Sequence, residues 1–395
     1  MNTIEILDRK DCCGCGSCMQ KCPKQAISMV KNSEGFLYPQ IDKEKCIKCG
    51  LCCKVCPQLK NVKKRNNEFP KAFAMRNKSN KELLQSSSGG IFSNIANYVL
   101  EQNGVIFGAA YNENLEVEHI KVEDQEEINK IRGSKYVQSN IRDMYKEAEK
   151  FLKEDRMVLF TGTPCQIAGL NSYLMKEYDK LITCDLVCHG VPSPELFQIY
   201  IDYLSKKFTS KVVKYNFRSK MKNGWGLYST VETEDGKIRY INPDFDPYYS
   251  NFLESTTYRL SCYQCHYTNC NRVANITLAD YWGISGIHPS FYKADGNSLV
   301  LINDLKGEKI LKEISENIEY IPTDLKKAIE HNKNLIEPSK YSKQREMIYK
   351  GIYAKNSQQY IKENLKVKLN TKKIIKAIIP NKIQRILKKM RGLVK

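Results

Sequence analysis

Hydrophobic positions after residue 70 fall into short apolar runs that alternate with segments of mixed polarity. Short runs rich in β-branched and aromatic residues indicate strands, and apolar residues at helical spacing indicate helices. The expected strands are 71–76, 105–110, 157–161 and 181–187. The expected helices follow Gly90, span 142–153, and begin at Pro164 and Pro194. Strands that alternate with helices in this way predict an α/β sheet.

Three later segments, 212–218, 228–232 and 237–241, have the pattern of antiparallel strands. The sheet should therefore be mixed. Before these elements, residues 60–70 are polar, basic and closed by proline, as in a linker.

The region before this linker is organised by cysteine spacing. Ten of the 16 cysteines lie in the first 56 residues, in two runs of the form CxxCxxCxxxCP. A cubane [4Fe-4S] cluster needs four converging thiolates, and in two-cluster ferredoxins the fourth cysteine of each run crosses to the other cluster. The first cluster would be held by Cys12, Cys15, Cys18 and Cys56, and the second by Cys46, Cys49, Cys52 and Cys22.

Zinc ribbons and disulfides are the alternatives for these runs. Zinc sites usually present paired CxxC units, whereas these are triple runs followed by proline, so clusters are favoured. Cys13 and Cys53 fall outside the ligand register, and we assign them no independent role. Because clusters require reduced thiolates, a reducing cytoplasm is expected.

The charge of the chain is uneven. The formal net charge is +19, and residues 366–395 carry 11 Lys and Arg and no acid. Apolar and basic residues alternate there at helical spacing, which predicts a basic amphipathic helix. It would lie on an anionic inner membrane face, or dock on the protein itself or on a partner. Nucleic-acid binding is not favoured, because no nucleic-acid fold accompanies the charge.

The N-terminus and the lengths of the apolar stretches indicate that the protein is neither secreted nor membrane-spanning. The N-terminus has acidic residues and no apolar core of a signal peptide. No uninterrupted apolar stretch reaches the ~18 residues of a transmembrane helix.

The six remaining cysteines follow predicted strands or lie in turns. They are Cys165, Cys184, Cys188, Cys262, Cys265 and Cys270. A third Fe-S cluster, a redox disulfide, a zinc site and inert buried cysteines all remain open for them.

Two glycine turns have the composition of a phosphate cradle. Ser87, Ser88, Gly89 and Gly90 precede a helix, whose N-terminal amides bind anions, although Ser and Gly also simply cap helices. Gly133, Ser134 and Lys135 add a cation beside a second turn. Together they suit an anionic nucleotide cofactor. No GxGxxG or Walker sequence follows a strand, so neither standard dinucleotide fold nor ATP hydrolysis is indicated.

No general acid or base stands out by spacing. His189 is equally suited to proton donation and to a structural turn, and His266 follows Cys265, where it would reach cluster sulfide. Trp282 is better suited to the core or to a ring-stacking wall than to catalysis.

Five segments in a fixed order carry a resemblance to a known family. They are SSSGG at 86–90, GSKYVQS at 133–139, TGTPCQ at 161–166, DLVCHGVPS at 185–193, and CYQCHYTNCNRVANITLADYWG at 262–283. As a set they resemble the beta-subunit family of coenzyme F420 hydrogenases and dehydrogenases, in the form fused to a two-cluster ferredoxin. The match covers roughly residues 1 to 345, so the basic tail lies outside it.

The resemblance implies FAD and a third [4Fe-4S] cluster in the main domain. It would make Cys165, Cys188, Cys262 and Cys265 the ligands of that cluster, with Cys184 and Cys270 in reserve. It would also place the two glycine turns and Gly162, Thr163 and Gln166 around the flavin and its phosphates. The expected α+β fold is a two-cluster ferredoxin-like domain (1–62), a mixed α/β flavin and Fe-S domain (63–345), and a basic helical tail (346–395).

The expected activity follows from the carriers that the resemblance implies. Clusters move single electrons, a deazaflavin accepts a hydride, and a flavin serves both. We expect a flavin-dependent iron-sulfur oxidoreductase that exchanges electrons with a redox partner protein or a small hydride carrier. Its substrate would be coenzyme F420 or another compound, with surface polysaccharide biosynthesis as one setting. The alternatives are a non-catalytic electron-relay subunit and a membrane-docked partner protein.

Overall fold

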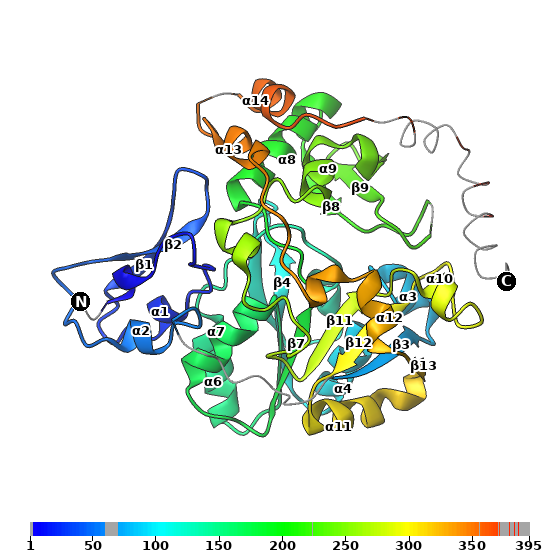
Figure 1. Cartoon of the computed structure of the whole chain (residues 1–395), viewed down its shortest axis with the longest axis horizontal. Coiled ribbons are helices and arrows are strands. Elements are labelled where there is room, and N and C mark those ends of the chain that lie inside the picture. The colour runs from blue at the N-terminus through cyan, green and yellow to red at the C-terminus, as the bar shows by residue number, and fades with distance from the viewer. Residues whose placement is uncertain are drawn as a thin grey trace.

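Two domains of unequal size make up the protein in its computed structural model (Figure 1). The described residues are 3–59, 70–222, 224–354 and 356–369, with 371, 379, 383 and 386. The predicted α+β class is confirmed: a small cysteine-rich domain sits beside a larger domain built on a mixed sheet.

The small domain is a hairpin with two short helices. Strands β1 (Ile27–Lys31) and β2 (Leu37–Ile41) pair antiparallel. Helices α1 (Ser17–Gln20) and α2 (Leu51–Lys54) each begin inside a cysteine run, after Gly16 and Gly50 in the left-handed conformation. A turn named η1 (Ile4–Ile6) precedes them. The two runs therefore fold alike, as their repeated spacing predicts.

The larger domain is built on an eight-stranded sheet in the order β13-β3-β12-β11-β7-β6-β4-β5. Neighbours from β11 to β4 run parallel and the outer pairs antiparallel, so the predicted mixed sheet is confirmed. Its strands are β3 (Lys71–Asn77), β4 (Val105–Tyr111), β5 (Val117–Val122), β6 (Val158–Thr161), β7 (Leu181–Leu186), β11 (Ile276–Asp280), β12 (Ser298–Ile302) and β13 (Ile318–Pro322).

Helices cover both faces of this sheet. The helices are α4 (Ile91–Glu101), α11 (Leu305–Ile314), α6 (Met144–Lys153) and α7 (Pro164–Leu174). The first two pack on Ile106 and Leu159, and the other two pack on Phe107 and Phe160. Neighbouring residues of one strand thus face opposite layers, which explains why these strands are apolar throughout.

The predicted antiparallel strands do form, but they make a separate sheet. Strands β8 (Val212–Asn216), β9 (Ser229–Thr233) and β10 (Ile238–Ile241) pair in the order β10-β9-β8. Helices α8 (Pro194–Phe208), α9 (Pro247–Leu253), α13 (Gln344–Tyr349) and α14 (Ser357–Asn364) accompany them. An aromatic core that includes Tyr200, Phe217 and Tyr248 joins these elements.

Residues just after 345 belong to this core. Ile348, Tyr360 and Ile361 are buried in it, and α14 packs against α8. The main domain therefore extends beyond the position where we expected the tail to begin. Most of the predicted tail helix at 366–395 lies outside the described residues.

The described residues also form several short helices. They are α3 (Asn80–Gln85), α5 (Ile128–Ile131), α10 (Ile284–Ile287), α12 (Leu325–Glu330), η2 (Pro243–Phe245), η3 (Leu260–Gln264), η4 (Ser315–Asn317) and η5 (Lys333–Leu335). Among the described residues, no helix has the length and apolar character needed to cross a bilayer.

Candidate functional site

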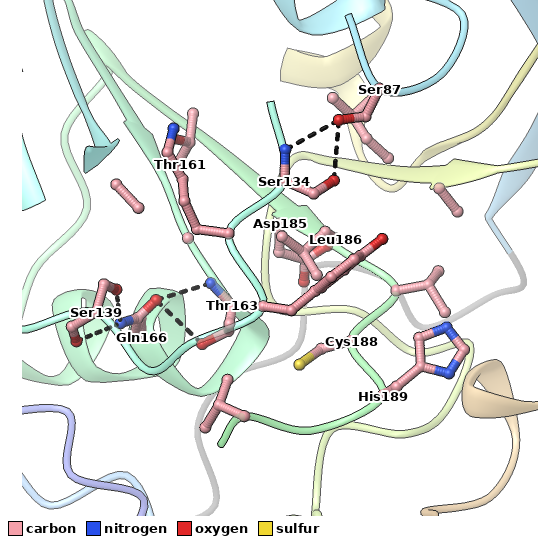
Figure 2. A pocket seen from close by; sticks show the side chains of 18 of the residues that line it. Ser87, Ser134, Ser139, Thr161, Thr163, Gln166, Asp185, Leu186, Cys188 and His189 are labelled. Carbon is pink, nitrogen blue, oxygen red and sulfur yellow. Dashed lines mark hydrogen bonds between the residues drawn. The ribbon is translucent and has the colours of Figure 1, made fainter. Parts of the chain in front are cut away.

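A cavity of about 330 Å³ opens at the carboxyl ends of the parallel strands. The last residues of β6, β7 and β11, which are Thr161, Leu186 and Asp280, all line it. Figure 2 shows the loops that follow β6 and β7 meeting there. In open sheets of this kind, ligands bind at the carboxyl ends of the strands.

The two predicted glycine turns meet on one wall of this cavity. The Ser134 amide donates to Ser87 Oγ at 2.9 Å, and the two hydroxyl oxygens lie 3.0 Å apart (Figure 2). Gly90 begins α4 in the left-handed conformation with a φ of 78°. Gly89 packs so closely that a Cβ there would lie 2.6 Å from the carbonyl oxygen of Met75. The turns thus form one surface rather than two separate ones.

Lys135 gives this wall a half-buried cation. Its Nζ donates to the carbonyl oxygens of Lys130 and Arg132 at 3.1 and 3.0 Å, and burial lowers its pKa to about 7. No carboxylate pairs with it among the described residues. Arg132, by contrast, is paired with Glu82. A half-buried ammonium held only by neutral groups suits an anionic ligand.

The turn after β6 is held by its own side chains. Gln166 Oε1 accepts from the Thr163 amide at 2.9 Å, and Gln166 Nε2 donates to Ser139 Oγ at 2.9 Å (Figure 2). Gly162 lines the cavity, where a Cβ would lie 3.0 Å from Gln166 Oε1. Gln166 therefore shapes the loop with both ends of its amide, although we predicted it as a cofactor contact.

Four of the later cysteines gather beside this turn. Cys165 lies in the first turn of α7, Cys188 follows β7, and Cys262 and Cys265 flank the end of η3. The first three line the cavity. Burial, followed by the neighbouring Cys265, raises the pKa of Cys188 to about 12. Burial, followed by Cys188 and Cys265, raises the pKa of Cys262.

The two reserve cysteines have different positions. Cys184 lies within β7 and reaches the cavity wall. Cys270 is buried in another cluster, with its Sγ 3.5 Å from the carbonyl oxygen of Leu335. The described residues contain no group of three or more His, Cys, Asp or Glu side chains spaced to hold a single metal ion.

Two small cavities in the N-terminal domain are lined by the eight cysteines that we predicted as cluster ligands. One is lined by Cys12, Cys15, Cys18 and Cys56. The other is lined by Cys22, Cys46, Cys49 and Cys52. Each cavity therefore combines three cysteines of one run with the fourth of the other, which is the predicted crossover.

Cys13 connects the first of these cavities to the main one. It lines both, and its thiol interacts with those of Cys15 and Cys165. Gln138 Nε2 donates to its carbonyl oxygen at 3.0 Å. We assigned Cys13 no role because the spacing rule covers only ligands. Its position between the cavities depends on how the domains pack, which the spacing does not encode.

An ion pair at the end of β11 forms another wall that the sequence did not reveal. Both Arg218 terminal nitrogens bind Asp280, at 2.6 and 3.0 Å, and Trp225 Nε1 donates to the same carboxylate at 2.7 Å. Burial favours a higher pKa for Asp280, but Arg218 outweighs it and the pKa is lowered. Trp225 stacks on Trp282 at 4.9 Å between ring centroids. Trp282 also packs against a core cluster and lines the cavity, so both of its predicted roles, core residue and ring-stacking wall, remain predictions.

The histidines differ in their access to the cavity. His189 lines it, and burial lowers its pKa. His119, which we did not predict, also lines it, with Nε2 2.9 Å from the Thr161 carbonyl oxygen. Burial lowers the pKa of His119 to about 4. His266 does not line the cavity.

Comparisons with known proteins agree with this division of the chain. A 4Fe-4S dicluster domain matches residues 11–59. The family described as the C terminus of the coenzyme F420 hydrogenase/dehydrogenase beta subunit matches residues 155–327. The chain carries a domain of this beta-subunit family. The family resemblance noted from the sequence is therefore confirmed over these residues, and the two matches together indicate an iron-sulfur redox protein.

Among solved structures, this beta-subunit-like chain is similar to one from the F420-reducing [NiFe] hydrogenase complex of Methanosarcina barkeri, studied by xenon derivatization. The identity is 19%, the match covers 68% of this chain and 91% of the other, and the TM-score is 0.46. No curated protein matches the sequence.

Proposed function

We propose that this protein is a flavin-dependent iron-sulfur oxidoreductase that passes electrons between its clusters and a hydride donor or acceptor. The observation that carries the proposal is the shared wall at Cys13. The cavity suited to the first cluster and the main cavity meet at this residue. Carriers bound in the two cavities would therefore be neighbours.

FAD fits the polar wall of the main cavity. The Ser87 hydroxyl and the start of α4 offer hydrogen-bond donors, and Lys135 offers a half-buried cation without a carboxylate. These groups would hold the phosphates. When bound, a flavin supplies the conversion between single electrons and a hydride. The chain itself would orient the ligand, and Trp282 adds an apolar surface to the cavity lining.

A third [4Fe-4S] cluster fits the thiols of Cys165, Cys188, Cys262 and Cys265. They come from three segments that converge at one end of the sheet, and all four can act as thiolate donors. Cys13 would place this cluster beside the first one. The proposed order along the molecule is the second cluster, the first cluster, the third cluster and the flavin.

Binding of FAD to a paired set of variants tests the proposal. Lys135→Met removes the half-buried cation, and Lys130→Met removes an exposed lysine that pairs with Glu127 in the same segment. We expect K135M to weaken FAD binding at least tenfold, because one charge-assisted phosphate contact is lost. K130M should bind FAD like the unsubstituted protein. If the unsubstituted protein bound no FAD, the flavin-dependent activity would be refuted.

A relay subunit that serves a redox partner protein is the second candidate. It is favoured by Cys49, a predicted ligand of the second cluster that is exposed at the surface. A cluster near the surface would exchange electrons with a docked protein. Full iron content without any flavin binding would favour this candidate.

Contact with an anionic membrane through residues 366–395, from the cytoplasmic side, stays a separate proposal. It rests on the basic amphipathic sequence pattern. Sedimentation with vesicles containing phosphatidylserine tests it. Deletion of 366–395 should abolish binding, and equal sedimentation with and without these residues would refute the membrane contact.

A further inference from the structure

Arg259 is a buried cation at the junction of the two domains. Only 1% of its surface is exposed. It immediately precedes η3, the turn that carries Cys262, and it also lines the main cavity. Its side chain reaches back to the N-terminal domain, so one residue contacts both candidate redox sites.

All three arms of the guanidinium are engaged by neutral groups. Nε donates to the carbonyl oxygen of Cys12 at 2.6 Å, and one terminal nitrogen donates to the carbonyl oxygen of Leu37 at 3.0 Å. The other donates to Gln138 Oε1 at 3.1 Å. Tyr38 packs on the guanidinium at 4.0 Å from the ring centroid. This enclosure excludes water from the charge.

Arg259 lacks the carboxylate that accompanies comparable arginines. Arg345, Arg272 and Arg218 are similarly buried, and each is bonded to an acidic side chain. Among the described residues, no carboxylate forms an ion pair with Arg259. A buried charge without a counterion is strongly unfavourable, so its surroundings must supply negative charge in another form.

The loop of the first cluster is the place where that charge would arise. Arg259 binds the carbonyl of Cys12, and a Cβ on Gly14 would lie 2.9 Å from its terminal nitrogen. The guanidinium therefore touches the backbone between Cys12 and Cys15. Four thiolates give a [4Fe-4S] centre a net negative charge, and nearby charges and hydrogen bonds set its reduction potential.

We propose that the charge of Arg259 raises the reduction potential of the first cluster above that of the second cluster. Reduction by one electron adds one negative charge and makes or breaks no bond. The guanidinium stabilises that added charge in a medium of low dielectric constant. The cavity of the second cluster has Lys24 and Lys48 instead, which are exposed and therefore screened by solvent. The difference favours electron flow from the second cluster toward the main cavity.

Redox titration of the anaerobically reconstituted full chain, followed by EPR, tests this proposal. Arg259→Gln removes the charge. At a fixed potential it should shift the oxidised-to-reduced ratio of the first cluster at least tenfold toward the oxidised form, about 59 mV for one electron. Arg259→Lys keeps the charge and should shift the ratio less. The signal that is left unaltered both by Cys49→Ser and by Cys262→Ser/Cys265→Ser identifies the first cluster.

A second variant keeps the test decisive if R259Q does not fold. Gln138→Glu places a carboxylate beside the intact arginine and should shift the ratio in the same direction. The double variant Glu34→Gln/Arg345→Gln removes an ion pair from the same domain boundary without changing the net charge. It should therefore leave the oxidised-to-reduced ratio of the first cluster unchanged. An unaltered ratio in Q138E, or in R259Q with full iron content, would overturn the proposal.

The inference depends on the first cluster and not on the flavin. A protein with no flavin would refute the proposed activity and leave the potential shift measurable. An unaltered potential would refute the role of Arg259 and leave flavin binding untouched.

Discussion

The N-terminal domain and the main cavity both collect cysteines, but by different means. In the N-terminal domain the cysteines of each group lie on two short runs, and local spacing brings them together. In the main cavity, Cys165, Cys188 and Cys262 arrive from separate segments at the ends of a sheet. A local site is thus encoded in spacing, whereas the cavity site depends on strand register and on buried polar contacts between loops.

The sharpest test of this difference removes two cysteines of the cavity. Cys262→Ser/Cys265→Ser should lose about four iron atoms per chain and keep the N-terminal eight, because the sites are assembled independently. Cys184→Ser/Cys270→Ser, which removes the two reserve cysteines, is the matched control and should keep all the iron. Iron and sulfide analysis after anaerobic reconstitution measures both. Unchanged iron in the first variant would contradict the third cluster.

The next test breaks the ion pair that holds the cavity loops. Arg272 binds the buried Asp185 at 3.0 Å and also donates to the carbonyl oxygens of Leu186 and Tyr267. Asp185→Asn should lower the free energy of unfolding by about 3–5 kcal/mol, because it leaves a buried arginine unpaired. Urea unfolding measures this loss.

The control for that ion pair is an exposed one. Asp202→Asn removes the partner of Lys206 on the surface of α8, and it should cost about 0–1 kcal/mol. Equal unfolding free energies for the two variants would show that the cavity loops do not depend on the buried pair.

A smaller effect is expected at the contact between the domains. Gly169 in α7 faces the first cysteine run, and a Cβ there would lie 2.9 Å from Cys15 Cβ and 2.8 Å from Tyr145 Oη. Gly169→Val should destabilise the protein by about 1–3 kcal/mol through overpacking. Gly286→Ala is the control, because its Cβ meets nothing within 4 Å. Thermal unfolding compares the two, and equal stability would mean that the domains do not pack closely there.

The smallest effect is a pH dependence of FAD affinity. Burial lowers the pKa of Lys135 from 10.5 to about 7, so its positive charge is lost as the pH rises through about 7. FAD affinity should then fall, by at most about tenfold per pH unit for one proton. The stability of the ligand-free protein depends on pH in the opposite sense. Between pH values of about 7 and about 10.5, Lys135 is protonated in the unfolded chain and deprotonated in the folded protein, so its contribution to the free energy of unfolding rises with pH.

Fluorescence titration with FAD from about pH 6 to about pH 9 measures this dependence. K135M should give a flatter profile. Burial also lowers the pKa of Lys220 to about 7, but Lys220 does not line the cavity. Lys220→Met should therefore keep the pH dependence, and a flat profile in the unsubstituted protein would contradict the role of Lys135.

Much of the fold could be predicted because the central strands are buried on both faces. Runs such as those of β4, β6 and β7 are apolar almost throughout, and helices α4, α7 and α8 begin directly after Gly90, at Pro164 and at Pro194. Strand β5 was missed because polar residues, including Glu118 and His119, interrupt its pattern. Strand β12 was missed because its run of four apolar residues is too short to be distinguished from a buried helix by periodicity, although the turn residues Asp295, Gly296 and Asn297 precede it.

The candidate site was predictable where its groups are local. The glycine turns and the cysteine runs follow spacing rules, and the structure brings the two turns together. Arg259 and Cys13 could not be found in this way, because their positions arise from contacts between domains. Gln166 lines the cavity, so its predicted contact with the cofactor stays a prediction, and its amide bonds to Thr163 and Ser139, which the sequence did not indicate.

Iron, sulfide and flavin per chain, measured on one anaerobically prepared sample, test the central claim most directly. We expect about twelve irons, about twelve sulfides and about one flavin per chain, which corresponds to three [4Fe-4S] clusters and one FAD. About eight irons without flavin would contradict it and leave a two-cluster ferredoxin joined to a domain with another role.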